Sequence, residues 1–280
     1  MKYILNILLI SFSWCIGFQG MIIPENGYVL STAGTGIAEG TSSNLNPAMY
    51  KLKNSYIQFS LNNWLNNIQG SQAMVYWGDD IPQSFSVQTW NANNIPLWGN
   101  NPASESLGDF SVHYISASYS ISHDLKTPYR FGLSVQTHYS HLFSESISSI
   151  SLNIGALFSL TSFIEAGLVL NNIGYESTNN IKAELPTELG FGLGIDLPFN
   201  VSLLTDAIYI SENGIDTRIG VKTHWKSINL HAGTSINKKR NANALGFSFN
   251  YRSWSISYGI YNHENSNLGI PQFFDIRRYI

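Results

Sequence analysis

From Leu185 to Leu197 the chain reads LPTELGFGLGIDL. Taken at every second residue, the stretch places large apolar side chains and one threonine on one face, and proline, acidic residues and glycines on the other. Successive side chains of a β-strand point to opposite faces, so this alternation predicts a strand with one apolar and one polar side. The same two-sided pattern recurs at residues 215–225, 227–236, 242–251 and 253–261.

The length of these strands indicates a membrane protein. Four of the five have about ten residues or more, whereas strands of soluble proteins centre on roughly 5–6 and a tilted strand that crosses a bilayer needs about 9–11. A soluble β-sandwich also alternates, but long paired strands without helical patterns favour a barrel with lipid outside and a polar lumen inside. We therefore predict an all-β fold, a transmembrane antiparallel β-barrel in the cell outer membrane.

The composition is typical of such a barrel. Charged residues make up 12% of the 280 residues and hydrophobic residues 44%, whereas soluble domains carry about 25% charged residues. The net charge is −3 and no basic run occurs, so nothing indicates nucleic-acid binding. Beyond the N-terminus no stretch approaches 18 apolar residues, so we expect any membrane crossing to use strands.

The first residues have the features of a secretory signal peptide. Lys2 supplies a positive charge, residues 3–16 are mostly apolar, and Cys15 and Gly17 occupy the −3 and −1 positions of a cut after Gly17. We predict a signal peptide over residues 1–17; an uncleaved anchor is the alternative, but the segment is short for a helix of about 20 residues. Cys15 is the only cysteine, so the mature chain would hold no disulfide and no thiolate metal site.

Residues 18–54 lack the strand pattern. Residues 32–40 read TAGTGIAEG, and such small residues permit close packing and unusual backbone angles. Residues 44–48 read NLNPA, in which asparagine before proline favours a turn. A phosphate-binding loop is disfavoured, because no Gly-Lys-Ser/Thr follows. We predict an N-terminal plug segment over 18–54 and a barrel over 55–280, and the plug's turn motif comprises Gly34, Gly36, Asn46, Pro47 and Ala48.

A small-residue segment, then Asn-Pro-Ala, then a run of long strands resembles the PorV/PorQ family, outer-membrane proteins tied to type IX secretion within the wider FadL-like barrel group. The resemblance continues through most of the mature chain. Matching stretches are SLNNW at 60–64, DFS at 109–111, ISASY at 115–119, LVLNNIG at 168–174 (similar to a family turn), LPTEL at 185–189, SY at 257–258 and LG at 268–269. The family implies a 14-stranded barrel that receives secreted cargo or places it at the cell surface.

Fourteen candidate strands can be placed after the N-terminal segment. They are expected at 55–64, 68–77, 82–90, 110–121, 129–141, 146–160, 162–171, 186–197, 199–209, 215–225, 227–236, 242–251, 253–261 and 271–280. The longest loop is expected at 91–108, where prolines and Trp98 indicate an ordered lid; the alternative is an ordinary extracellular loop.

Histidines are the main candidates for chemistry, and we expect none of them to perform it. His138 and His141 are three residues apart on a predicted strand, so they face opposite sides and cannot easily reach one metal ion. His224 and His231 are expected to face the lumen, where a nearby serine would complete a Ser–His pair of an outer-membrane esterase. No acid is placed as a third member, so we predict no catalytic residue, no metal and no cofactor.

Charged residues on the polar faces are more informative. Inside a water-poor lumen, charges must pair or find hydrogen bonds. Some of these residues are expected to hold the glycine-rich segment as a plug; the alternative is a hydrated pore lined by mixed charge. The residues concerned are Glu188, Asp196, Asp206, Asp216, Arg218 and Lys222.

Three functions are consistent with this reading. The first is a non-enzymatic PorV/PorQ-like component of type IX secretion, whose partners would be outer-membrane lipid, other secretion-system proteins and secreted cargo. The second is a FadL-like transporter of hydrophobic small molecules. The third and weakest is an outer-membrane hydrolase. The mixed charge of the lumen favours secretion, whereas an apolar pocket beside the plug would favour transport.

Overall fold

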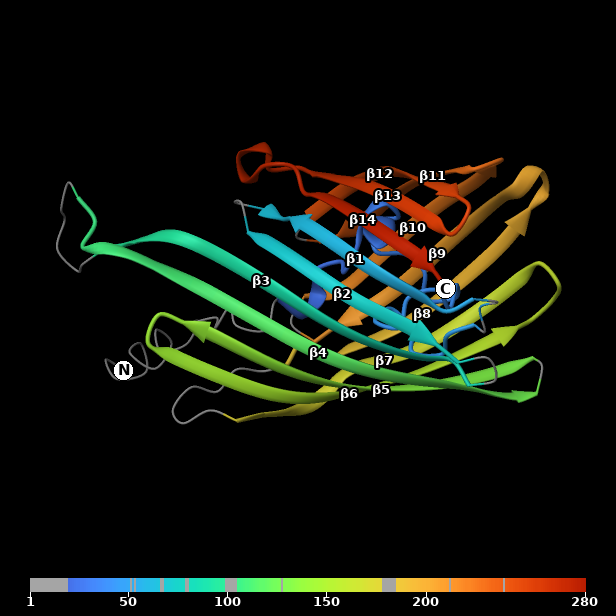
Figure 1. Ribbon diagram of the computed structural model, residues 1–280, viewed down its shortest axis with the longest axis horizontal. Helices are drawn as coiled ribbons and strands as arrows, with labels where there is room; N and C mark the ends of the chain where they lie inside the picture. The colour runs from blue at the N-terminus through green and yellow to red at the C-terminus, as the bar shows by residue number, and fades with distance from the viewer. Residues whose placement is uncertain are drawn as a thin grey trace, which may run out of the picture.

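The computed structural model describes residues 20–280 except 51, 53, 66–67, 79–80, 99–104, 127, 178–184, 212 and 239. The described chain forms fourteen antiparallel strands, each paired with its sequence neighbour, and β1 pairs with β14 to close the barrel (Figure 1). This architecture confirms the predicted fold class and strand number. The predicted signal peptide, residues 1–17, lies outside the described residues.

The first seven strands are β1 (Tyr56–Asn63), β2 (Gln69–Trp77), β3 (Gln83–Leu97), β4 (Gly108–Lys126), β5 (Tyr129–Leu142), β6 (Glu145–Ser159) and β7 (Ile164–Ser177). The other seven are β8 (Glu188–Leu197), β9 (Val201–Ile210), β10 (Gly214–Trp225), β11 (Ile228–Asn237), β12 (Arg240–Tyr251), β13 (Trp254–His263) and β14 (Gln272–Tyr279). Short helical turns also occur, among them α1 (Gly27–Ser31), η3 (Pro198–Asn200) and η4 (Ser266–Leu268). In the described part of the chain, no helix has the length and apolar character needed to span a membrane.

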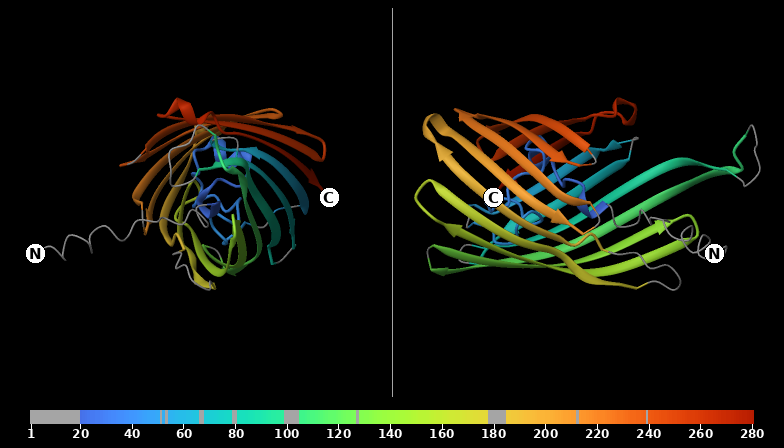
Figure 2. Two further views of the ribbon diagram at one scale, coloured as in Figure 1. Left: turned by 90° about the vertical axis from the view of Figure 1, so that its left-hand side faces the viewer. Right: turned by 180° about the vertical axis from the view of Figure 1, so that it is seen from behind.

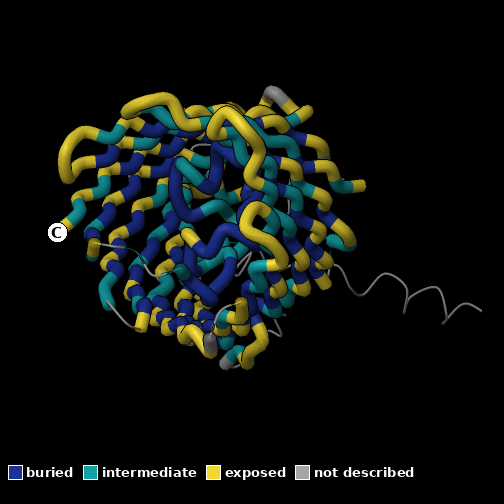
Figure 3. The backbone as a smooth tube through the Cα atoms, turned by 90° about the vertical axis from the view of Figure 1, so that its right-hand side faces the viewer, coloured by how far each residue is buried: buried dark blue, intermediate teal, exposed yellow. Residues whose placement is uncertain are grey.

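Alternation along the strands separates an apolar outside from a polar inside. In β8, Leu189 and Phe191 are 56% and 45% exposed, whereas Gly190 and Gly192 are buried. Figure 3 shows the same alternation of buried and exposed residues around the barrel. Aromatic side chains lie at the ends of the outer face, among them Trp225, Tyr251 and Trp254. An apolar wall with aromatic ends matches a lipid bilayer, and the chain is an outer-membrane barrel.

The two ends of the barrel differ. Connections that follow even-numbered strands are short and lie with the C-terminus at one end, here called the turn end; those that follow odd-numbered strands lie at the loop end (Figure 1). The wall is uneven, because β3–β7 have 14 to 19 residues and β8–β14 have 8 to 12.

The expected lid at 91–108 is wrong for residues 91–97 and 108, and residues 99–104 lie outside the described part of the chain. Strand β3 continues to Leu97 and β4 begins at Gly108, so residues 91–97 belong to the wall. Strand β3 contains a bulge between Ala92 and Ile95, where Asn94 has a φ of 56°. A bulge accommodates an extra residue while the hydrogen-bonded ladder continues beyond it.

The expected turn at 168–174 is wrong for the same reason. Strand β7 passes through it with a bulge against β6, and Asn172 has a φ of 61°. The Asn172 backbone N–H donates to Asn153 Oδ1 at 2.8 Å, and Asn172 Nδ2 donates to the Pro186 carbonyl at 2.9 Å. The bulge leaves both Asn171 and Asn172 buried on the inner side of the wall.

Residues 20–50, here called the inner segment, lie inside the barrel (Figures 2 and 3). Helix α1 begins after Asn26, whose side-chain oxygen accepts the Val29 N–H at 3.0 Å and so caps the first turn. Further on, Ala33, Gly34, Gly36 and Gly40 have positive φ angles. These residues bend the segment so that it can follow the inside of the wall.

Candidate functional site

Glycines on eight strands form a track on which the inner segment rests. The segment meets β13 first, at Gly27, then β12, β11, β10, β8 and β7, and reaches β6 and β5 at Asn46 and Pro47. It therefore runs around the barrel in the reverse order of the strands. We call the contacting residues the glycine track: Gly132, Gly155, Gly167, Gly192, Gly220, Gly233, Gly246 and Gly259.

The glycine track permits backbone to lie against backbone. A Cβ atom added at Gly132 or Gly167 would lie under 3.0 Å from the Pro47 or Ile37 backbone, closer than real Cβ atoms approach. A Cβ at Gly233 would meet the Thr32 backbone in the same way. Glycine in a strand often marks such a close approach of another backbone.

Two buried aspartates bind consecutive N–H groups of the inner segment. Asp206 Oδ2 in β9 accepts from the Gly36 and Ile37 N–H groups at 2.7 and 3.2 Å. In β14 the Asp275 carboxylate accepts from the Gly27 N–H at 2.8 and 2.9 Å, and from that of Tyr28 at 3.3 Å. Hydrogen bonds to an ionised acceptor are about twice as strong as neutral ones, so these carboxylates fix the segment at two points.

The Asn46-Pro47-Ala48 turn packs against the wall at β6. Asn46 Nδ2 donates to the carbonyls of Ile37 and Ala156 at 2.8 and 3.2 Å. Its Oδ1 accepts the Ala48 N–H at 2.9 Å, which is the local bond expected of asparagine in a turn. The asparagine thus joins two parts of the inner segment to the barrel.

Three of the charges expected in the lumen, Asp216, Arg218 and Lys222, form ion pairs, and both cations contact the inner segment. Arg218 pairs with Asp216 and donates from Nη1 to the Gly34 carbonyl at 2.9 Å. Lys222 forms an ion pair with Glu39 of the inner segment.

The remaining two predicted charges have other surroundings. Asp196 is exposed at the turn end, where it accepts from Ser202 Oγ at 2.6 Å. Glu188 lines a cavity beside the segment.

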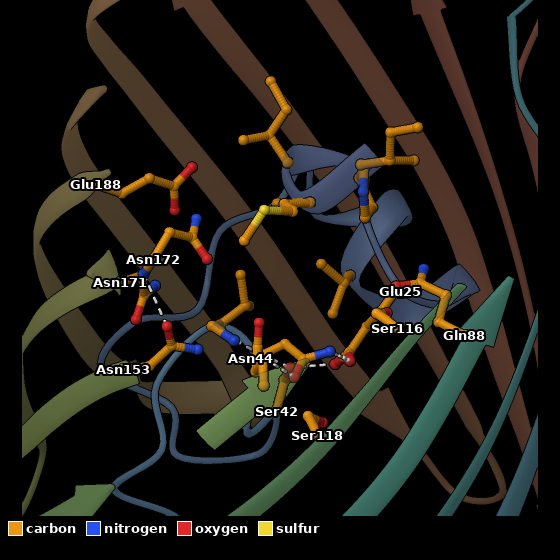
Figure 4. Close-up of a pocket in the computed structure, with 18 of the residues that line it drawn as sticks. Glu25, Ser42, Asn44, Gln88, Ser116, Ser118, Asn153, Asn171, Asn172 and Glu188 are labelled. Carbon is orange, nitrogen blue, oxygen red and sulfur yellow. Dashed lines mark hydrogen bonds between the residues drawn. The ribbon is translucent and has the colours of Figure 1, made fainter. Parts of the chain in front are cut away.

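That cavity, the inner chamber, has a volume of about 80 Å³ and lies between the inner segment and the inner face of β3–β10 (Figure 4). The barrel contributes mostly hydroxyl and amide side chains, including Gln88, Ser116, Ser118, Asn153 and Asn171, and the inner segment contributes apolar ones such as Met21, Ile23 and Leu45. A larger hollow of about 340 Å³, the turn-side vestibule, lies on the other side of the segment between Glu39, Lys222, His231 and Arg277.

An apolar cluster occupies the loop end of the lumen. The Trp64 ring lies 5.8 and 5.9 Å from the rings of Tyr261 and Phe273, and Trp90 lies 5.9 Å from Phe273. We call this group the aromatic cluster. Its buried members include Trp90, Tyr114, Ile147, Leu185, Tyr261 and Phe273, and its partly buried members are Met21, Ile23, Trp64 and Ile68.

Glu25 is a buried carboxylate of the inner segment. It accepts hydrogen bonds from Ser42, Asn44 and Gln72, the last at 2.9 Å from Nε2. Burial raises the pKa of the Glu25 carboxyl above its ordinary 4.5, while these bonds and the charge of Arg277 oppose the rise.

The raised pKa predicts a pH dependence. Because the folded state holds the Glu25 proton more tightly than the unfolded state, Glu25 stabilises the fold below pH 4.5 and loses this contribution as the pH rises through the raised value. Measured in detergent between pH 4 and 8, the free energy of unfolding should fall more with pH in the wild type than in Glu25→Gln. Parallel curves for the two proteins would contradict a raised pKa of Glu25 in the folded state.

The histidines show no arrangement for catalysis. His138 faces the lumen and bonds Tyr114 Oη and Ser151 Oγ at 2.8 and 3.0 Å, whereas His141 bonds Ser146 on the exposed side. His231 Nδ1 lies 3.2 Å from Ser31 Oγ, and His224 is exposed. In the described ranges, no three His, Cys, Asp or Glu side chains are grouped to hold a metal ion.

Sequence reasoning missed several residues of this site. Glu25, Glu39 and Asp275 were not singled out, although Asp275 alternates with apolar residues in the last strand and so carries a period-two signal. The aromatic cluster carries no local signal, because its members are spread along the sequence from Met21 to Phe273.

Comparison with protein-family models and with curated proteins finds no match. Solved structures do match. The CymD monoaromatic hydrocarbon channel has a TM-score of 0.67 at 10% identity and covers 96% of this chain and 99% of its own. The fold is that of the FadL-like outer-membrane barrels.

Two further structures agree with this fold. The Pseudomonas putida toluene transporter TodX has a TM-score of 0.63 at 13% identity and covers 96% of this chain and 98% of its own. A Pseudomonas aeruginosa FadL homologue has a TM-score of 0.62 at 11% identity, with coverage of 93% and 98%. At these identities the likeness concerns the fold.

Proposed function

We propose that this barrel is an outer-membrane transporter of small hydrophobic molecules, in which the inner segment acts as a plug. The observation that carries the proposal is the aromatic cluster, which lies inside the lumen at the loop end and contacts the segment through Met21, Ile23 and Leu30. An apolar ligand that enters from the loop end would meet this surface before it meets the plug.

The aromatic cluster does not suit a simple porin. Water-filled porins have polar lumens, whereas here Trp64 and Ile68 keep part of their apolar surface uncovered at the loop end. Binding sites for small molecules are mostly apolar and aromatic with a few placed polar groups. The hydrocarbon channel and toluene transporter that share the fold support the same class of ligand.

The glycine track and the two aspartates support the plug role. They hold the segment across the lumen, so the alternative of an open, hydrated pore lined by mixed charge is disfavoured. The type IX secretion reading rests on the motif resemblance alone. No hydrolytic arrangement occurs among the described residues to support the third reading.

A binding measurement tests the proposal. Trp64→Ala should weaken the binding of a hydrophobic probe such as 1-N-phenylnaphthylamine about tenfold or more, because loss of a large apolar contact costs about 1.5–3 kcal/mol. Fluorescence titration of the purified barrel gives the dissociation constant. The control is Trp225→Ala, which removes a side chain that is 66% exposed on the outer face. Equal affinities for the two variants would count against a loop-side site.

A further inference from the structure

The inner chamber and the turn-side vestibule lie on opposite sides of the plug. Two residues line both hollows, Val29 and Ser42. Val29 belongs to α1, whereas Ser42 follows the glycine-rich stretch, so the two approach from separate parts of the inner segment. Both residues therefore lie between the two hollows, and we call them the partition.

The chamber wall is a grid of hydrogen-bonding groups. Ser86, Ser118 and Gln136 are in register across β3, β4 and β5, and the next row contains Gln88, Ser116 and His138. Ser86 Oγ and Ser118 Oγ are 2.8 Å apart. This part of the wall offers many donors and acceptors to a polar guest, and the apolar lining comes mainly from the inner segment.

Two atoms of this wall lack partners within the described residues. Gln88 Nε2 and Asn171 Oδ1 have no hydrogen bond, although their residues are only 8% and 5% exposed. Both residues line the chamber, one from β3 and the other from the β7 bulge. A buried polar atom without a partner costs about 1–3 kcal/mol, so these atoms call for a hydrogen-bonding molecule in the chamber.

The vestibule, towards the turn end, is also lined by polar side chains. Its lining from β12 and β13 consists of Ser248, Asn250, Ser255 and Ser257. Val29 is its single aliphatic lining residue. A polar surface therefore extends on both sides of the partition.

We propose that the barrel contains a passage for water and small uncharged polar solutes, which joins the inner chamber to the vestibule and is closed in this structure by Val29 and Ser42. The chamber of about 80 Å³ admits a few water-sized groups, since one water occupies roughly 30 Å³. A charged solute would lose its hydration shell there at high cost. The passage goes beyond hydrophobic transport and does not depend on it.

Glu25 positions the partition. Ser42 Oγ donates to its carboxylate, and Asn44 Nδ2 does the same. Glu25 is in turn held to the wall by Gln72 of β2 and by Asn62 of β1, whose Nδ2 donates to the Glu25 carbonyl at 3.1 Å. Loss of this carboxylate frees Ser42 without changing the residues that fill the partition.

A chamber cysteine reports on the passage. Ser118→Cys, made in a Cys15→Ser background, places a thiol in the chamber for reaction with iodoacetamide, a small neutral reagent. Val29→Ala combined with Ser42→Gly should accelerate the labelling at least tenfold. The matched control, Val135→Ala with Ser71→Gly, removes the same atoms from exposed positions on the outer face and should leave the rate unchanged. Equal rates in the two double variants would overturn the proposal.

Heat-modifiable gel mobility shows whether the double variant folds. If it does not fold, a second measurement tests the passage with a different variant. Glu25→Gln keeps the size of the side chain. In liposome swelling with urea and with guanidinium, which are similar in size but differ in charge, Glu25→Gln should increase the entry of urea severalfold and that of guanidinium little. Equal entry of both solutes, or no increase over the wild type, would refute a passage for uncharged solutes that Glu25 controls.

Discussion

Alanine at Gly132 or Gly167 should sharply reduce the yield of folded barrel, whereas alanine at Gly194 should leave it unchanged. At the first two positions the new methyl group would lie under 3.0 Å from the backbone of Pro47 or Ile37. At Gly194 the nearest atoms are side-chain carbons at 3.5 and 3.7 Å, which is ordinary contact. An overpacked side chain typically destabilises a fold by about 1–3 kcal/mol. Backbone atoms in a closed barrel can move away from the added methyl group less easily than side-chain atoms can.

The comparison is made by refolding the three variants into detergent or lipid and scoring heat-modifiable mobility, with the free energy of unfolding for those that fold. The Gly132→Ala and Gly167→Ala double variant should lose more than either single change. If both clashing variants fold as well as Gly194→Ala, the segment does not rest on the glycine track.

Removing the carboxylates that bind the inner segment should have the second large effect. Asp206→Ala leaves the Gly36 and Ile37 N–H groups without their acceptor, and Asp275→Ala does the same to Gly27 and Tyr28. Two unpaired buried donors cost about 2–6 kcal/mol. Each variant should therefore lose stability on that scale in denaturant titration, and its inner segment should become susceptible to protease.

The matched control is Asp196→Ala, because Asp196 is exposed and its bond is to Ser202 of the barrel. Asp206→Asn, which retains an acceptor oxygen, should lie between the wild type and the alanine variant. A segment that resists protease equally in Asp206→Ala and Asp196→Ala would show that the carboxylate does not hold it.

The fold was predictable because one rule governs every strand. Alternation in β8 and β10–β13 has the period of two that a wall between lipid and lumen requires. The strand ends were less predictable, because asparagine and proline favour turns locally, and such residues occur at and near Asn94 and Asn172. Pairing with the neighbouring strands overrides these signals and converts both sites into bulges.

The site was less predictable than the fold. The sequence period assigns Arg218 and Lys222 to the inner face, but their partners depend on the path of the inner segment, which no local pattern encodes. Glu39 and Asp275 acquire their contacts only once residues 20–50 lie inside the closed barrel. The aromatic cluster likewise forms from residues as distant in sequence as Trp64 and Phe273.

The two sides of the plug offer different chemistry. The loop end presents aromatic rings, whereas the barrel wall of the chamber and of the vestibule presents mostly polar side chains. The inner segment adds apolar side chains to the chamber, among them Met21, Ile23 and Leu45, so a hydrophobic ligand below the aromatic cluster would meet both kinds of surface. Passage of hydrophobic molecules and passage of small polar solutes are separable properties of this barrel, and the Trp64 and Val29–Ser42 variants address them independently.

The most direct test of the transporter proposal is to purify the tagged protein in mild detergent from the outer membrane that contains it, and to analyse bound proteins and small molecules by mass spectrometry. The account predicts a barrel that carries a hydrophobic small molecule in near-stoichiometric amount, reduced in Trp64→Ala and retained in Trp225→Ala. Recovery of secretion-system components or secreted proteins without such a ligand would contradict it and favour the secretion role.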